Sequence, residues 1–143
     1  LISNMVYLWV FGNNIEDRLG HFKYLLFYLT CGFLAALCQW FINTNSVVPS
    51  LGASGAIAGV LGAYLIWFPQ ARITTLIFLG FFITTINIPA LLIIGIFFVQ
   101  NLISGFASLQ TAAKMGIETG GVAYWAHLGG FVVGSLFALG NRE

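Results

Sequence analysis

Residues 24–42 read YLLFYLTCGFLAALCQWFI and carry no charged side chain. A helix needs about 20 consecutive apolar residues to cross the hydrocarbon core of a bilayer, and this stretch has that length. The whole chain follows the same trend, because 59% of its 143 residues are hydrophobic and only 6% are charged. Soluble domains carry about 25% charged residues. We therefore expect membrane lipids to surround this protein, and its net charge of +1 favours neither nucleic acid nor an acidic partner.

Other uncharged segments extend this pattern on both sides of the first one. We predict spans at residues 51–68, 90–106 and 122–140, and we interpret residues 1–12 as the tail of a further span. Residues 13–23, 43–50 and 107–121 are predicted to be loops. The chain opens inside an apolar stretch without Met at position 1, so we expect its N-terminal part to be missing. The expected fold is all-α, a polytopic transmembrane helix bundle in one domain over residues 1–143.

Residues 73–106 are harder to interpret, because they are too long for one span and barely long enough for two. Asn87 and Pro89 interrupt them, and the first half is rich in Ile and Thr. We expect residues 73–86 to form a short interfacial or re-entrant segment and only residues 90–106 to span.

This choice sets the expected orientation. Most basic residues then lie on the cytoplasmic side of the membrane, where basic residues are favoured. These are Arg18, Lys23, Arg72 and Arg142. Lys114 alone then falls outside. This choice also makes Ser54 and His127 begin helices at the same outer face.

Ser54 lies in Gly52-Ala53-Ser54-Gly55, at the predicted start of a helix. Glycines beside a serine leave its backbone open to close approach, and the free N–H groups of a helix N-terminus suit an oxyanion. These four residues alone favour a loop that ends in an N-cap serine.

His127 is the second candidate for a role in catalysis, because an ionisable side chain inside an apolar span is costly and usually functional. A histidine that hydrogen-bonds a neighbouring helix for packing is the competing interpretation.

The spacing of glycines connects the two residues. Gly55-x-x-x-Gly59 and Gly130-x-x-x-Gly134 are small-x-x-x-small patterns, which let helix backbones approach closely. Two helices packed along these faces would bring Ser54 to His127, and a serine becomes a nucleophile when a base lies within about 3 Å. The acids Glu16, Asp17 and Glu143 are expected on the opposite side, and Glu118 lies in the outer loop, where its position relative to the pair is open. We therefore predict a Ser–His dyad without an acid, and neither a cofactor nor a metal ion.

Gly52-Ala53-Ser54-Gly55 on one span and Ala126-His127-x-x-Gly130 two spans later resemble the rhomboid family of intramembrane serine proteases. Residues 11–20 (FGNNIEDRLG) are similar to the cytoplasmic loop of bacterial rhomboids. The resemblance implies a core of six helices, of which about five are covered here. It also implies that Ser54 and His127 cut transmembrane protein substrates, from a short helix that begins in a water-filled cavity. The implied location is a bacterial inner membrane, with the active site opening to the outer face.

The same resemblance assigns further residues. The family carries His-x-x-x-Asn on its second helix, so Asn4 would join the Ser54 backbone N–H in the oxyanion hole, and the motif's histidine would precede Leu1. Many members have a tyrosine four residues after the serine that packs on the histidine ring. Ala58 stands here instead, and Tyr124 or Trp125 are the candidates to replace that ring. Residues 90–106 resemble the mobile gate of the family, and the loop at 107–121 resembles its cap.

Two other functions compete with proteolysis. A non-catalytic rhomboid-like membrane chaperone or scaffold would lack one or both dyad residues, whereas this chain has both. A transporter that uses His127 as a proton relay would place further acids or bases inside the spans, and the predicted spans contain none. The sequence indicates neither the substrate nor the oligomeric state.

Overall fold

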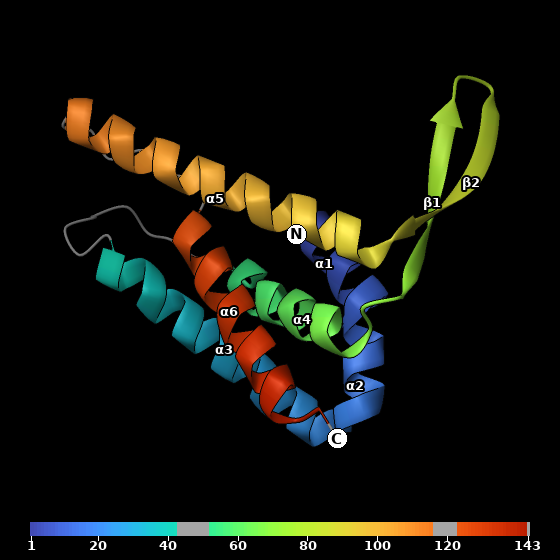
Figure 1. Ribbon diagram of the computed structural model, residues 1–143, viewed down its shortest axis with the longest axis horizontal. Helices are drawn as coiled ribbons and strands as arrows, with labels where there is room; N and C mark the ends of the chain where they lie inside the picture. Colours follow the sequence, from blue (N-terminus) through green and yellow to red (C-terminus); the bar gives the residue numbers. More distant parts are fainter. Residues whose placement is uncertain (43–51, 116–122, 143) are drawn as a thin grey trace.

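The computed structural model describes residues 1–42, 52–115 and 123–142. Its helices and strands, in chain order, are α1 (Ile2–Tyr7), η1 (Leu8–Gly12), α2 (Asn13–Leu19), α3 (His21–Ile42), α4 (Ser54–Trp67), β1 (Arg72–Leu79), β2 (Phe82–Pro89), α5 (Ala90–Met115) and α6 (Tyr124–Gly140). The element η1 is a π-helix, and it joins α1 to α2 without a gap. Within the described residues, a predominantly helical bundle is therefore present, as the sequence predicts (Figure 1).

The predicted loop at residues 13–23 is wrong in conformation, because it is helical except at one residue. Gly20 ends α2 with a positive φ of 79°, a backbone conformation that glycine adopts without steric cost. Its N–H bonds to the carbonyl of Glu16 at 2.7 Å, and α3 begins at the next residue. The side chains of Glu16 and His21 also meet across this break at 2.6 Å. The dense charge therefore marks a tight helix–helix corner.

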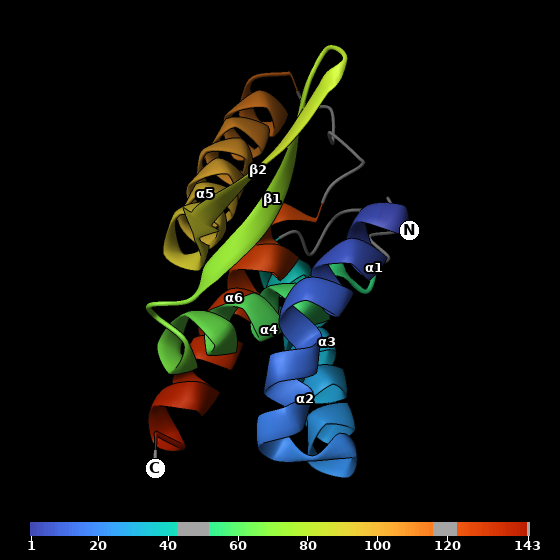
Figure 2. The same ribbon diagram turned by 90° about the vertical axis from the view of Figure 1, so that its right-hand side faces the viewer.

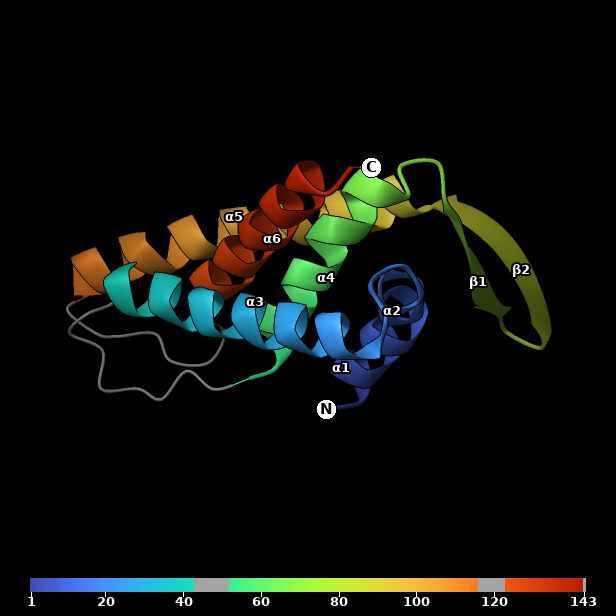
Figure 3. The same ribbon diagram turned by 90° about the horizontal axis from the view of Figure 1, so that it is seen from below.

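Helix α4 lies at the centre of the bundle, with α6, α3 and α5 around it (Figures 1 and 3). Every residue of α4 from Gly55 to Tyr64 is buried. The outer helices instead expose large apolar side chains, such as Leu29 and Phe33 of α3 and Ile103 of α5. A surface of this kind fits lipid as the surrounding solvent.

Two of the predicted spans are long enough to cross a bilayer, and two are shorter than expected. Helices α3 and α5 have sufficient length and apolar composition. Helix α4 has 14 residues and α6 has 17, which gives about 21 and 26 Å against a hydrocarbon core of about 30 Å. The expected first residues of these spans, Leu51 and Val122, lie outside the described part of the chain.

Residues 73–86, expected to be an interfacial or re-entrant segment, belong to a β-hairpin. Strands β1 and β2 pair antiparallel with Leu79 opposite Phe82, so that Gly80 and Phe81 form the turn. Ile and Thr favour strands because their branched side chains fit a pleated surface. The hairpin projects away from the helices (Figures 1 and 3), and Figure 2 views the molecule from the side on which it projects. No spanning helix lies in these described residues, in agreement with the prediction.

Helix α5 extends beyond the predicted span end at residue 106 and runs to Met115, so the loop predicted from residue 107 is wrong up to that point. Thr111 donates its hydroxyl to the carbonyl of Ala107 at 2.9 Å, which satisfies this polar side chain within the helix. Residues 116–121 of that loop, and the predicted loop at residues 43–50, lie outside the described residues.

The ends of α2, α4 and α6 meet at one end of the molecule. The Arg18 guanidinium lies 4.7 Å from the centre of the Trp67 ring and donates to the carbonyl of Asn141 at 3.4 Å. The Trp67 indole N–H donates to the carbonyl of Ala138 at 3.1 Å. These contacts bring Arg18 beside the segment that leads to Arg142, as the predicted gathering of basic residues requires.

Candidate active site

Ser54 is the first residue of α4, and Ala53 occupies the N-cap position. The N-cap interpretation of this serine is therefore wrong. Its hydroxyl lies 2.7 Å from Nε2 of His127, within hydrogen-bond distance. The first N–H groups of an α-helix lack partners inside the helix, so the Ser54 N–H is available at the same place.

His127 lies in the first turn of α6 and is 8% exposed. Its two ring nitrogens contact two different helices, because Nε2 meets Ser54 of α4 and Nδ1 meets Asn101 of α5. The competing interpretation of a packing histidine is thus compatible with the contacts, but one of the two partners is a hydroxyl at a helix start.

The predicted glycine faces are in direct contact. A Cβ atom added at Gly130 would overlap the carbonyl oxygen of Gly55, and one at Gly134 would overlap that of Gly59. Helices α4 and α6 form the most extensive helix pair of the structure. Side chains at these positions would separate the two backbones, so the glycines allow the distance between Ser54 and His127.

Gly52 lies on the other side of the serine. A Cβ at this position would come within 3.2 Å of the Ser54 hydroxyl oxygen. A larger residue would therefore crowd the hydroxyl that contacts His127.

Asn101 was not among the residues predicted for the site, although it contacts the predicted histidine. Its Oδ1 lies 2.6 Å from Nδ1 of His127, and its side chain is buried, with 7% exposure. The signal in the sequence was an amide inside a long uncharged stretch. In the structure, Asn101 shares a helical face with the buried residues Ala90 and Ile94.

The aromatic ring beside His127 comes from Phe97, which corrects the expectation that Tyr124 or Trp125 would replace the tyrosine missing at Ala58. The ring centres of Phe97 and His127 are 5.7 Å apart. Trp125 instead packs edge-on against Phe106, at 5.5 Å between ring centres.

Asn4 lies half-buried on α1, a helix that contacts α4. Its contribution to an oxyanion hole stays a prediction.

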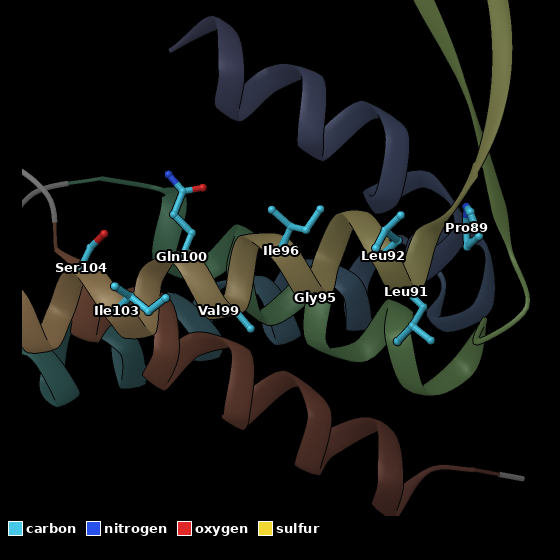
Figure 4. A pocket seen from close by; sticks show the side chains of 9 residues that line it. All are labelled: Pro89, Leu91, Leu92, Gly95, Ile96, Val99, Gln100, Ile103 and Ser104. Atoms are coloured by element: carbon cyan, nitrogen blue, oxygen red, sulfur yellow. The ribbon is translucent and has the colours of Figure 1, made fainter.

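An apolar groove of about 970 Å³ runs along the outer face of α5 (Figure 4). Its lining includes Leu92, Ile96 and Gln100, whereas Asn101 belongs to the buried face of the same helix. Helix α5 thus presents a mainly apolar outer surface, while the polar side chain of Asn101 faces the interior.

Fold and site together define a polytopic helical membrane protein with a partly buried serine–histidine pair between two closely packed helices. The Rhomboid domain family model matches residues 1–142. The chain belongs to the rhomboid family.

Curated relatives give the same family. The chain is 33% identical to mitochondrial Rhomboid protein 1 of Saccharomyces cerevisiae, over 94% of this chain and 35% of that protein. It is 34% identical to the mitochondrial Presenilin-associated rhomboid-like protein of Bos taurus, over 87% of this chain and 33% of that protein. It is 32% identical to chloroplastic Rhomboid-like protein 11 of Arabidopsis thaliana, over 94% of this chain and 44% of that protein. No solved structure matches the chain significantly.

The chain spans about a third of the length of the first two of these relatives. The three relatives are named for mitochondria and chloroplasts, so they do not support the bacterial inner membrane that the sequence resemblance implied.

Proposed function

We propose that the protein is an intramembrane serine endopeptidase, with Ser54 as nucleophile and His127 as general base. The observation that carries the proposal is the 2.7 Å contact between the Ser54 hydroxyl and Nε2 of His127. Family membership supports the same function, and both dyad residues are present, which disfavours a non-catalytic chaperone or scaffold.

The reaction is acyl transfer. His127 takes the hydroxyl proton of Ser54 at Nε2 while the serine oxygen attacks the carbonyl carbon of a substrate peptide bond. The carbonyl oxygen becomes an oxyanion, which accepts hydrogen bonds from the Ser54 backbone N–H and the Asn4 side chain. The protonated His127 then donates its proton to the leaving amine. Water, activated by the same histidine, releases the acyl group and restores Ser54.

The length of α4 supports a site below the membrane surface. Trp67, at the far end of α4, contacts Arg18, whose charge belongs near the membrane–water interface. Ser54 lies about 20 Å from that end, so about 10 Å of bilayer remains beyond it. A peptide bond within or near a transmembrane segment is within reach at this depth.

Transmembrane protein substrates are therefore the proposed class. The apolar groove on α5 is the face along which such a segment would approach. Helix α5 would then act as the gate that residues 90–106 resemble. The site would open to the face at which α4 and α6 begin.

The test combines a fluorophosphonate probe, which labels activated serines, with cleavage of a transmembrane reporter in nanodiscs. We expect both signals from the full-length protein and neither from Ser54→Ala or His127→Ala. Ser108→Ala is the matched control. It makes the same change at another serine, whereas the two ring nitrogens of His127 contact Asn101 and Ser54. Cleavage retained by Ser54→Ala would refute the proposal, and a folded wild-type protein without either signal would favour the chaperone or scaffold.

A further inference from the structure

Asn101 makes two hydrogen bonds that together determine how its amide group is oriented. Its Nδ2 donates to the backbone carbonyl of Phe97 at 2.8 Å, and its Oδ1 lies 2.6 Å from Nδ1 of His127. A carbonyl oxygen can only accept a hydrogen bond. Rotating the amide by half a turn would put two oxygens 2.8 Å apart, so the oxygen of Asn101 must face the histidine.

This orientation also determines the tautomer of His127. A neutral imidazole carries one N–H, and the Asn101 oxygen can only accept, so the proton belongs on Nδ1. Nε2 is then unprotonated and offers its lone pair to the Ser54 hydroxyl. The four groups form one directed chain, in which the serine donates to the histidine, the histidine to the asparagine, and the asparagine to Phe97.

We infer that Asn101 is a positioning residue that keeps His127 in its basic tautomer and holds the plane of its ring. The inference rests on the proposed protease function. It replaces the predicted two-residue arrangement with a Ser–His–Asn one, in which an amide takes the place of the carboxylate of soluble serine proteases.

A neutral amide suits the surroundings better than a carboxylate would. Asn101 is buried in a helix that has no charged residue from residue 90 to residue 113. Burying an ionised carboxylate in such an environment is costly. The amide oxygen still accepts the Nδ1–H, both in the neutral ring and in the imidazolium that forms when Ser54 loses its proton. The Phe97 side chain packs beside the imidazole and limits its tilt.

The experiment compares Asn101→Leu, Asn101→Asp and Thr111→Val in the full-length protein in nanodiscs. Leu removes both hydrogen bonds of the side chain and keeps the volume, whereas Asp keeps the acceptor toward His127 and loses the donor to Phe97. Thr111→Val is the matched control, because the Thr111 hydroxyl also bonds to a carbonyl four residues back on α5. The measurements are kcat, KM, the pH dependence of kcat/KM and the thermal unfolding midpoint.

For Asn101→Leu we expect kcat to fall about 10- to 100-fold, with KM changed less than about twofold, because the histidine populates the wrong tautomer. The acidic midpoint of the pH profile should move to lower pH, since the imidazolium loses its acceptor. Asn101→Asp should recover most of kcat and move that midpoint to higher pH, by about one unit. Thr111→Val should match the wild type.

A readout independent of turnover is the ¹⁵N spectrum of histidine-labelled protein, with the His127 signals assigned by their loss in His127→Ala. We expect the Nδ1–H form in the wild type and in Asn101→Asp, and a mixture of tautomers in Asn101→Leu.

Wild-type kcat and an unshifted pH profile in folded Asn101→Leu would overturn the inference. So would a ¹⁵N spectrum of folded Asn101→Leu that shows the Nδ1–H form alone, because the Asn101 oxygen would then not determine the tautomer. Cleavage by Ser54→Ala would instead refute the protease proposal, while the ¹⁵N spectra would still decide the tautomer.

Discussion

At the scale of single residues, the site depends on glycines, which have no side chain at the contact between α4 and α6. Gly130 and Gly134 of α6 lie directly against the carbonyl groups of Gly55 and Gly59 of α4. The hydrogen bond between Ser54 and His127 spans the interface that these glycines allow.

Gly130→Ala tests this dependence. The added methyl group would overlap the Gly55 carbonyl oxygen, and relieving that overlap requires α6 to move away from α4. We expect a loss of about 1–3 kcal/mol in the free energy of unfolding together with loss of fluorophosphonate labelling. Gly140→Ala, on the same helix, is the control, because a Cβ there meets nothing within 4 Å. Normal labelling of Gly130→Ala would show that the close approach is dispensable.

Phe97→Leu tests the ring beside the histidine. An aromatic contact contributes about 0.5–1.5 kcal/mol, so its loss should lower kcat by about two- to tenfold if it holds the imidazole in place. The neighbouring Phe98→Leu provides a matched comparison, since Phe98 packs on Phe131 at 4.8 Å between ring centres. Steady-state kinetics that show equal effects of both changes would assign Phe97 to general packing.

At the scale of elements, the β-hairpin is the unexpected feature. A two-stranded ribbon leaves backbone groups unpaired at both edges, and these cannot be satisfied in the hydrocarbon core. Its end nevertheless exposes Phe78, Phe81 and Phe82. An interfacial position satisfies both requirements, because the backbone can reach water while the rings contact lipid.

Phe81→Trp tests the position of the hairpin. Phe81 is fully exposed in the turn, so the substitution should leave the fold unchanged. We expect the added fluorescence, measured as the difference from the parent protein, to be quenched most by lipids brominated near the headgroup. Absence of quenching would place the turn in water, and strongest quenching by bromine at the chain ends would place it in the core.

At the scale of the whole molecule, the arrangement of charges predicts how the bundle lies in the membrane. The Arg18 end of α2 meets the end of α6 that precedes Arg142. Arg72 lies beside Ala71, whose carbonyl accepts the N–H of Ala90 at the start of α5. Lys114 is in the last turn of α5, at the other end of that helix.

Lys23 and Lys114 are the two lysines of the sequence, and both are exposed. A membrane-impermeant amine reagent added from the side on which α4 and α6 begin should therefore modify Lys114, and Lys23 only after the membrane is permeabilised. Peptide mass spectrometry distinguishes the two sites. Modification of both lysines from one side would contradict the predicted orientation.

The amino-acid sequence was enough to predict the helical membrane class and most of the helices, because partition into lipid depends on the composition of a segment and little on its neighbours. It determined the family through Ser54, His127 and their glycines. The extension of α5 to Met115 was missed, because polar residues near a helix end can continue the helix when their side chains bond within it, as Thr111 does. The helical corner at Gly20 was missed, because a single glycine with a positive φ is enough to separate two helices.

The groups that surround His127 are known from the packing of the helices alone. The pairing of Asn101 with Nδ1, and of Phe97 with the ring, depends on how α5 is rotated about its axis and where it crosses α6. No local pattern encodes that rotation, because both faces of α5 are largely apolar and either could face lipid. The position of one amide opposite one imidazole is therefore a property of the assembled bundle.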